Sequence, residues 1–148
     1  MDNFINAITT GVIDSIVFAV LVYLLQIYRY WKILKSKFHN KTFQGFFKQA
    51  PGDSVQTIKL SVKQNVIQFK GTGTIDNDPF EGELIMNPIN LKIGEGFHYH
   101  KNSEGYGFVK VIIKDDDTFL LESPYIQMTD ENRIGTIIPQ AFIWRRKK

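Results

Sequence analysis

An apolar tract near the N-terminus constrains the fold of this chain more than any other feature. From Ser15 to Ile27 the sequence reads SIVFAVLVYLLQI, and the run extends back to Phe4 with Asp14 as its only charged residue. As a helix this run would be about 36 Å long, against ~30 Å of hydrocarbon in a bilayer. Its part from Ile16 to Leu25 is apolar all round, whereas a helix of a soluble domain keeps a polar face. No basic region precedes it and no small-residue cleavage site follows, so we predict a transmembrane helix and not a signal peptide.

Aromatic and basic residues alternate where the tract ends, as is typical of a membrane interface. This interfacial group consists of Tyr28, Arg29, Tyr30, Trp31 and Lys32. By the positive-inside rule we expect the N-terminus outside and the rest of the chain in the cytoplasm, at a bacterial inner membrane. We therefore predict a transmembrane region at residues 1–31, and a basic juxtamembrane linker at 32–41 that rests on anionic headgroups.

The positive charge of the chain is local. The net charge is +3 and the isoelectric point is about 9.0, but residues 28–41 alone contain Arg29, Lys32, Lys35, Lys37 and Lys41. After residue 41 the basic and acidic residues balance, so the rest of the chain gives no general reason to expect non-specific binding of nucleic acid. The absence of cysteine excludes disulfides and thiolate metal sites.

A polar stripe interrupts the first half of the apolar tract. Asn6, Thr10 and Asp14 recur every four residues and share one face of a helix. A carboxylate at the bilayer centre costs about 2.5–3.5 kcal/mol, which falls when stripes from neighbouring helices face one another or water. We therefore predict a homo-oligomer whose helices line a polar path with these residues. The alternative is a span from Val12 to Tyr30, which places Asp14 near the outer headgroups and needs no pore.

After Phe38 the sequence consists of short runs rich in Val, Ile, Phe, Thr and Tyr, separated by turn residues. This pattern indicates an all-β domain at residues 42–148. We expect a small antiparallel β-barrel of about eight strands, with a sandwich as the second choice. Gly71 and Gly73 are interpreted as bulges or bends that allow closure. The predicted strands are Thr42–Gln49, Val55–Val62, Val66–Ile75, Phe80–Met86, Leu91–Ile93, Gly96–His100, Gly105–Lys114, Thr118–Ser123 and Ile134–Trp144.

No pattern in the chain predicts an enzyme, a metal site or a bound cofactor. His98 and His100 share a strand face in GFHYH, but no third ligand pattern accompanies them, so we interpret them as exposed or pocket-lining histidines. Nucleophile, zinc-protease and paired-carboxylate signatures are lacking. We predict no catalytic residue.

A small barrel can still bind one ligand in its interior or mouth. Bases near aromatic residues could bind phosphates and stack nucleobases. On this basis the predicted ligand-binding residues are Lys110, Arg145, Arg146, Tyr99 and Tyr106, with Trp144 near them in the sequence. The alternative is that they form an ordinary barrel exterior.

The layout of the chain resembles membrane effectors of bacterial anti-phage nucleotide-signalling systems. The resemblance covers the Phe4–Ile27 span, the Tyr28–Lys41 junction and the strand-rich remainder. One similar class is the CBASS effector with membrane helices and a STING-like β-barrel. Another is the channel component of the Hailong system, which an oligodeoxyadenylate signal is understood to hold closed. CBASS effectors of this kind have more than one membrane helix, so the single span here is more similar to the Hailong channel.

This resemblance implies an oligomeric channel, with a tetramer favoured, that acts with a nucleotidyltransferase and depolarises the membrane of an infected cell. Our leading hypothesis is therefore a homo-oligomeric pore gated by a nucleotide or oligonucleotide bound to the cytosolic barrel. Only a ligand with different affinities for two arrangements of the helices could gate such a pore. The first rival is a membrane-tethered adaptor or ligand-binding module without channel activity. The second is an anchored enzyme or lipocalin-like carrier.

Overall fold

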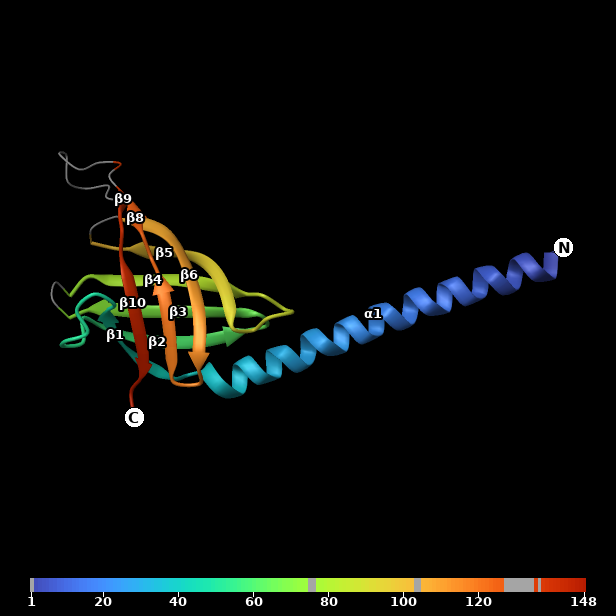
Figure 1. Ribbon diagram of the computed structural model, residues 1–148, viewed down its shortest axis with the longest axis horizontal. Coiled ribbons are helices and arrows are strands. Elements are labelled where there is room, and N and C mark those ends of the chain that lie inside the picture. Colours follow the sequence, from blue (N-terminus) through green and yellow to red (C-terminus); the bar gives the residue numbers. More distant parts are fainter. Residues whose placement is uncertain (1, 75–76, 103–104, 127–134, 136) are drawn as a thin grey trace.

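The computed structural model describes residues 2–74, 77–102, 105–126, 135 and 137–148, with residues 2–8 and Tyr125 described by their backbone. It shows one long helix that leads from the N-terminus into a curved β domain (Figure 1). The ends of two predicted strands, at Ile75 and Ile134, lie outside the described residues. So does the side chain of Asn6.

The helix α1 runs unbroken from Asp2 to Phe38. Within the described part of the chain, Thr9–Phe38 forms a single candidate membrane span, and none of its most apolar window is buried by the protein. Its apolar side chains point away from the axis in all directions: Phe18 is 69% exposed and Leu25 is 61% exposed. A helix with this surface is consistent with a single-pass membrane protein.

The β domain contains eight main strands and two short ones within the described residues. The main strands are β1 (Thr42–Phe47), β2 (Gln56–Lys63), β3 (Val66–Gly73), β4 (Pro79–Met86), β5 (Ile93–His100), β6 (Tyr106–Asp115), β7 (Thr118–Glu122) and β10 (Ala141–Arg146). The short strands β8 (Tyr125–Ile126) and β9 (Ile137–Ile138) pair with each other, and β8 also pairs with β6.

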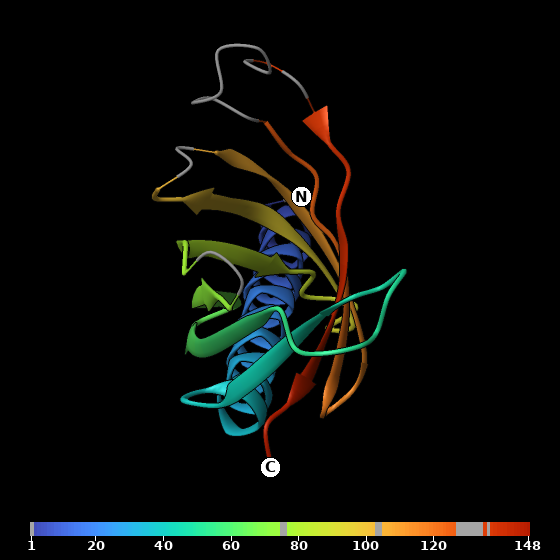
Figure 2. The same ribbon diagram turned by 90° about the vertical axis from the view of Figure 1, so that its left-hand side faces the viewer.

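The main strands close into the predicted antiparallel barrel. Their order is β5-β4-β3-β2-β1-β10-β7-β6, and the pairing of β5 with β6 completes the circle. Figure 2 shows the strands curving around a common interior. Closure leaves the main strands without free edges, which protects a small β domain from edge-to-edge association.

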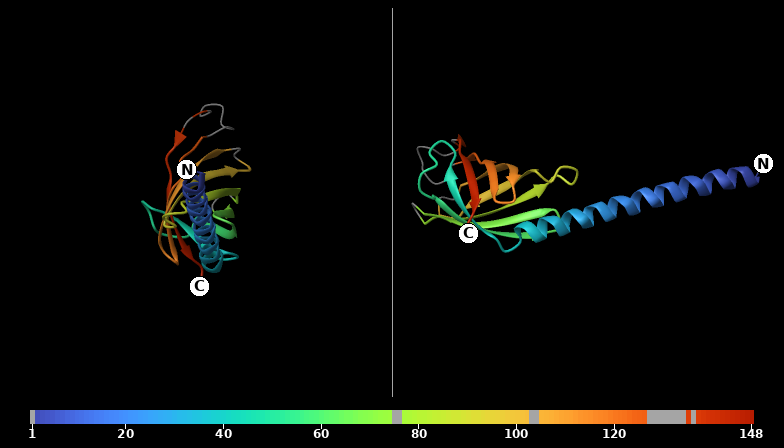
Figure 3. Two further views of the ribbon diagram at one scale, coloured as in Figure 1. Left: turned by 90° about the vertical axis from the view of Figure 1, so that its right-hand side faces the viewer. Right: turned by 60° about the horizontal axis from the view of Figure 1, so that its bottom comes forward.

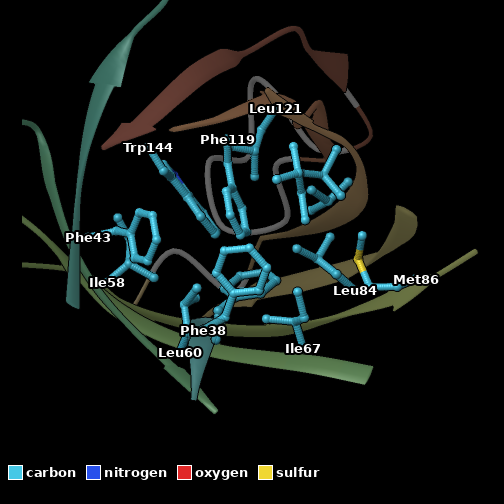
Figure 4. Close-up of a cluster of buried hydrophobic side chains, with 14 of the residues drawn as sticks. Phe38, Phe43, Ile58, Leu60, Ile67, Leu84, Met86, Phe119, Leu121 and Trp144 are labelled. Atoms are coloured by element: carbon cyan, nitrogen blue, oxygen red, sulfur yellow. The ribbon is translucent and has the colours of Figure 1, made fainter. Parts of the chain in front are cut away.

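Apolar side chains fill the centre of the barrel because inward and outward positions alternate along each strand. In β2, for example, Ile58, Leu60 and Val62 are buried while Lys59 and Lys63 are exposed. The rings of Phe43, Phe119 and Trp144 meet in the centre (Figure 4). An interior of this kind is a packed core and not a channel.

Two predicted strand boundaries differ from the structure. Leu91–Ile93 and Gly96–His100 were expected as separate strands, but Ile93–His100 forms one continuous strand. The predicted strand Ile134–Trp144 contains two elements, β9 and β10, separated by Pro139 and Gln140. Proline lacks the N–H that a continuous ladder needs, which explains the division.

A bulge at Gly71 and Gly73 is absent, since β3 pairs in regular register with β2 through both residues. The glycine at 71 serves packing instead. A Cβ at Gly71 would collide with the Phe80 ring, and one at Gly82 would collide with the Phe69 ring. These glycines make room for large inward-facing rings.

The helix continues through most of the region predicted as a linker and ends inside the barrel. Leu34 and Phe38, one turn apart, are 1% and 2% exposed. The Phe38 ring meets the Phe119 ring edge-on, with 4.9 Å between centroids. Asn40 then adopts the left-handed conformation that ends many helices, with φ of 58°. Its N–H donates to the Leu60 carbonyl at 2.9 Å. The helix therefore closes one end of the barrel.

Candidate functional site at the distal mouth of the barrel

Buried polar residues gather at the end of the barrel opposite the helix, which we call the distal mouth. Among the described residues, the buried polar or charged ones are Gln56, Asp78, His98 and Ser123, between 3% and 8% exposed. All four lie at this end, on or beside β2, β4, β5 and β7. Burial of polar groups is costly unless they are hydrogen-bonded, so such a cluster in a small barrel indicates either a specific structural role or a binding site.

One half of the cluster joins Asp78 to His100. The Oδ2 atom of Asp78 is 3.2 Å from Nδ1 of His100, and its Oδ1 accepts a hydrogen bond from the Asn102 N–H at 2.8 Å. The His100 ring stacks on Phe80, with centroids 5.4 Å apart. The carboxylate and the aromatic ring thus fix the orientation of the imidazole at the rim of the mouth.

The other half lies deeper and joins His98 to Ser123. Nε2 of His98 is 3.2 Å from the Ser123 hydroxyl and 3.5 Å from the Pro124 carbonyl. Burial and, to a smaller extent, the nearby His100 imidazole lower the pKa of His98 to about 4, against the opposing effect of the Pro124 carbonyl. The two rings are 5.2 Å apart, edge to face. His98 is therefore neutral at pH 7 and able to exchange hydrogen bonds without carrying charge.

A small cavity opens onto this cluster. It has a volume of about 150 Å³ and is lined by Gln56, Asp78, His100 and Gln140 together with the rings of Phe47, Phe80 and Phe142. Phe47 and Phe142 stack at 5.2 Å. The volume is that of about five water molecules at ~30 Å³ each. The mouth therefore has room for a small planar group between aromatic walls and polar edges.

The sequence pointed to these histidines without placing them together with the other members of the site. His98 and His100 were predicted as pocket-lining or exposed, and the structure shows one buried and one at the rim. Asp78, Gln56 and Ser123 were missed, because they come from separate strands and turns that only barrel closure brings together. Within the described residues, no group of three metal-ligating side chains is present.

The five predicted ligand-binding residues do not gather at one site. Lys110, Tyr99 and Tyr106 lie on the outer wall of β5 and β6, where Tyr99 pairs with Tyr106 and Lys110 pairs with Glu95. Arg145 and Arg146 lie on β10, which β7 separates from β6. Trp144 points into the core, where its Nε1–H donates to Gln56 at 3.2 Å.

Arg146 connects the helix to the barrel. One guanidinium nitrogen donates to the Lys37 carbonyl in the last turn of α1, at 2.5 Å. Its Nε atom is 3.2 Å from a carboxylate oxygen of Asp117. Lys37 itself pairs with Asp116 at 2.7 Å. Two ion pairs with the β6–β7 turn therefore support the joint where the helix enters the barrel.

The outer wall of β5 and β6 is unusually apolar for a surface in water. Cross-strand neighbours there are Phe97 with Phe108 and Ile93 with Ile112, and Phe108 is 74% exposed. Exposed apolar patches on soluble domains commonly mark contact surfaces. We call this surface, which also includes Tyr99 and Tyr106, the aromatic wall.

The interfacial group predicted from the sequence lies on the last turns of the helix before the barrel. Tyr28 and Trp31 are in ring contact at 5.7 Å, and the Lys32 and Lys35 ammonium groups lie over Tyr28 and Trp31 at 5.6 and 4.9 Å. Thr10 and Asp14 are exposed on one face near the far end of α1.

The fold therefore defines a barrel protein with a membrane-type helix. A comparison of the chain with protein-family models, curated proteins and solved structures finds no match.

Proposed function

We propose that this protein is a homo-oligomeric membrane channel in which helices of neighbouring copies line a polar path and the barrels control it through a bound ligand. The observation that carries the proposal is the continuity of α1 with the barrel core. Leu34 and Phe38 are buried in the barrel, and Arg146 holds the last turn of the helix. A ligand that repositions the barrels would therefore also move the helices, since the two parts share one core.

Self-assembly is supported by two surfaces whose polarity does not suit their surroundings. The Thr10–Asp14 face of the helix is polar in a segment suited to lipid, and the aromatic wall is apolar on a domain suited to water. Contact between copies would remove the first from lipid and the second from water. The tether to one membrane also raises the effective concentration of the barrels, so modest contacts suffice. Glu95 and Lys110 are cross-strand neighbours on β5 and β6, so the aromatic wall also carries one negative and one positive charge.

The ligand class that we propose is a nucleotide or short oligonucleotide that places one base in the distal mouth. The rings of Phe47, Phe142 and His100 offer planar surfaces for stacking. The Gln56, Gln140 and Asp78 side chains offer donors and acceptors for the edge of a base. The Asp78 carboxylate disfavours a phosphate inside the mouth, so the phosphates would lie outside it. The role in anti-phage defence stays a prediction from the resemblance.

Ion conduction can be tested in two settings with the same variants. Wild type, Asp14→Leu and the apolar control Val17→Leu are expressed in bacteria with a membrane-potential dye, and each purified full chain is reconstituted in liposomes for ion-flux measurement with and without adenine oligonucleotides. We expect depolarisation or flux with wild type and Val17→Leu, and its loss with Asp14→Leu at equal membrane abundance. Wild-type protein that passes no ions in either setting would contradict the channel and favour the adaptor.

Contact through the aromatic wall has its own test. The chain lacks cysteine, so a Phe108→Cys variant can be cross-linked in membranes with a short bifunctional maleimide. The control is Lys59→Cys, exposed on β2. Cross-linked dimers of the first variant alone support assembly through this wall, whereas equal or absent cross-linking in both variants contradicts it.

A further inference from the structure

The turn between β4 and β5 projects an apolar side chain into open space at the helix end of the barrel. Ile89, at the tip of this turn, is 89% exposed, the highest value among the described large apolar residues. The turn is well ordered by hydrogen bonds. The Asn87 side chain accepts the N–H groups of Ile89 and Asn90 at 2.8 and 3.0 Å, and the Asn90 side chain accepts that of Lys92 at 3.1 Å.

This turn lies beside the helix and not beyond it. Figure 1 and the right-hand view of Figure 3 show the β4–β5 connection extending from the barrel along the side of α1. A groove of about 640 Å³ separates them, and Pro88 lines it together with Tyr23, Leu24 and Ile27 of the helix. The tip therefore reaches the level at which the interfacial group gives way to the apolar span.

We propose that the β4–β5 tip is a second membrane contact, which inserts Ile89 at the boundary between headgroups and acyl chains on the side where the barrel lies. The reason is geometric: a bilayer that surrounds Leu24 up to the belt of Tyr28 and Trp31 necessarily meets a turn that lies beside these residues. Two exposed bases flank the segments that line this groove, Lys63 at the end of β2 next to Gln64 and Lys92 in the same turn as Pro88, which favours an anionic surface. An exposed isoleucine on a rigid turn is costly in water and suited to this boundary.

The contact would fix the depth of the helix. With Ile27 at the edge of the hydrocarbon, Asp14 lies about 20 Å farther along the helix axis, at 1.5 Å per residue. This is well inside ~30 Å of hydrocarbon. The inference thus favours the Phe4–Ile27 span over the Val12–Tyr30 alternative, and it places the carboxylate where a neighbouring helix or water must accommodate it. It rests on the membrane-spanning part of the proposed function and not on ion conduction.

Single cysteines in this cysteine-free chain test the contact directly. Ile89→Cys is labelled with the environment-sensitive dye NBD, and the full chain is reconstituted in vesicles of phosphatidylglycerol and phosphatidylcholine that carry nitroxides at shallow or deep acyl positions. Asp53→Cys, on the exposed β1–β2 loop of the distal mouth, is the matched aqueous control. Leu21→Cys, inside the span, is the lipid control.

We expect NBD at position 89 to be blue-shifted and quenched mainly by the shallow nitroxide, with position 53 unquenched and position 21 quenched by the deep one. If position 89 behaves as position 53 does while position 21 remains in lipid, the contact is absent although the helix spans. A blue shift at 89 without nitroxide quenching would assign the tip to a protein partner and also overturn the proposal. Loss of quenching at 21 would instead overturn the span itself, and with it both proposals.

Discussion

The helix and the barrel of this protein place their apolar side chains in opposite directions. Along α1 the residues from Val12 to Leu25 point outward on every side, whereas along the barrel strands apolar residues alternate with polar ones and point inward. The helix lacks an interior of its own, so its surroundings must supply the apolar phase. The barrel supplies that phase for itself. One chain therefore combines a segment suited to an apolar environment with a domain suited to water.

The two regions meet at Leu34 and Phe38, where the helix no longer exposes its apolar side chains but buries them. These residues are on the helix but are buried in the barrel. From this point the basic side chains of Lys32, Lys35 and Lys37 cover the outside of the helix while one apolar face turns inward. The junction is thus a part of the barrel core. Substitutions at the junction should destabilise the barrel, whereas substitutions farther along the helix should not.

The largest expected effect is that of Phe38→Ala. Deletion of a buried phenylalanine ring typically costs about 3–5 kcal/mol, because contacts are lost and a cavity remains. The unfolding transition of the barrel, followed by the fluorescence of Trp31 and Trp144 during urea titration of the detergent-solubilised chain, should move to lower urea. The control Phe18→Ala, on the part of the helix outside the barrel, should leave the transition in place, because Phe18 is 69% exposed. Equal effects of the two variants would mean that α1 ends outside the barrel core.

The second effect is a dependence of the stability of the barrel on pH, which arises from His98 and not from the helix. His98 has a pKa of about 4 in the folded barrel and one near 6.5 when unfolded. Between these values the unfolded chain binds more protons, so stability declines as the pH falls below 6.5. The total loss is about 3 kcal/mol when pH 4 is reached. Urea titrations from pH 7.5 to 4 should show this slope, and His98→Gln should flatten it. An unchanged slope in the variant would assign the pH dependence to other groups.

The smallest effect concerns the ionic joint. Arg146→Ala removes the guanidinium that bonds the Lys37 carbonyl and pairs with Asp117, and because this side chain is partly exposed we expect a loss of about 1 kcal/mol. Lys70→Ala removes a largely exposed pair with Glu81 and should change the stability by no more than about 0.5 kcal/mol. The same urea titration measures both. A loss for Lys70→Ala as large as that for Arg146→Ala would contradict a specific role of the joint.

Much of the fold could be predicted from local patterns. The span was visible because Ile16 to Leu25 is apolar without period, and most strands were visible because residues such as Ile58, Leu60 and Val62 alternate with polar ones. The continuation of the helix to Phe38 was not predicted, although Trp31, Leu34 and Phe38 recur at helical spacing among the bases. The abundance of lysine there obscured a pattern with only three apolar members.

The candidate site was the least predictable part. His98 and His100 could be recognised as neighbours on one strand face, but Asp78 and Ser123 come from connections more than twenty residues away from them. Lys110 and Arg146 both carry a positive charge suited to phosphate, yet Lys110 lies on the outer wall and Arg146 lies at the helix joint. Neither position could be derived without the strand order.

The sequence by itself determined the two classes of element, an apolar helix and a set of alternating strands, because hydrophobic periodicity is a local property of the chain. Only the tertiary structure decided that β5 pairs with β6 to close the barrel, that Phe38 enters its core and that Asp78, His98, His100 and Ser123 meet at one mouth. These contacts join residues distant in sequence, and their geometry depends on strand order and register, which no local pattern encodes.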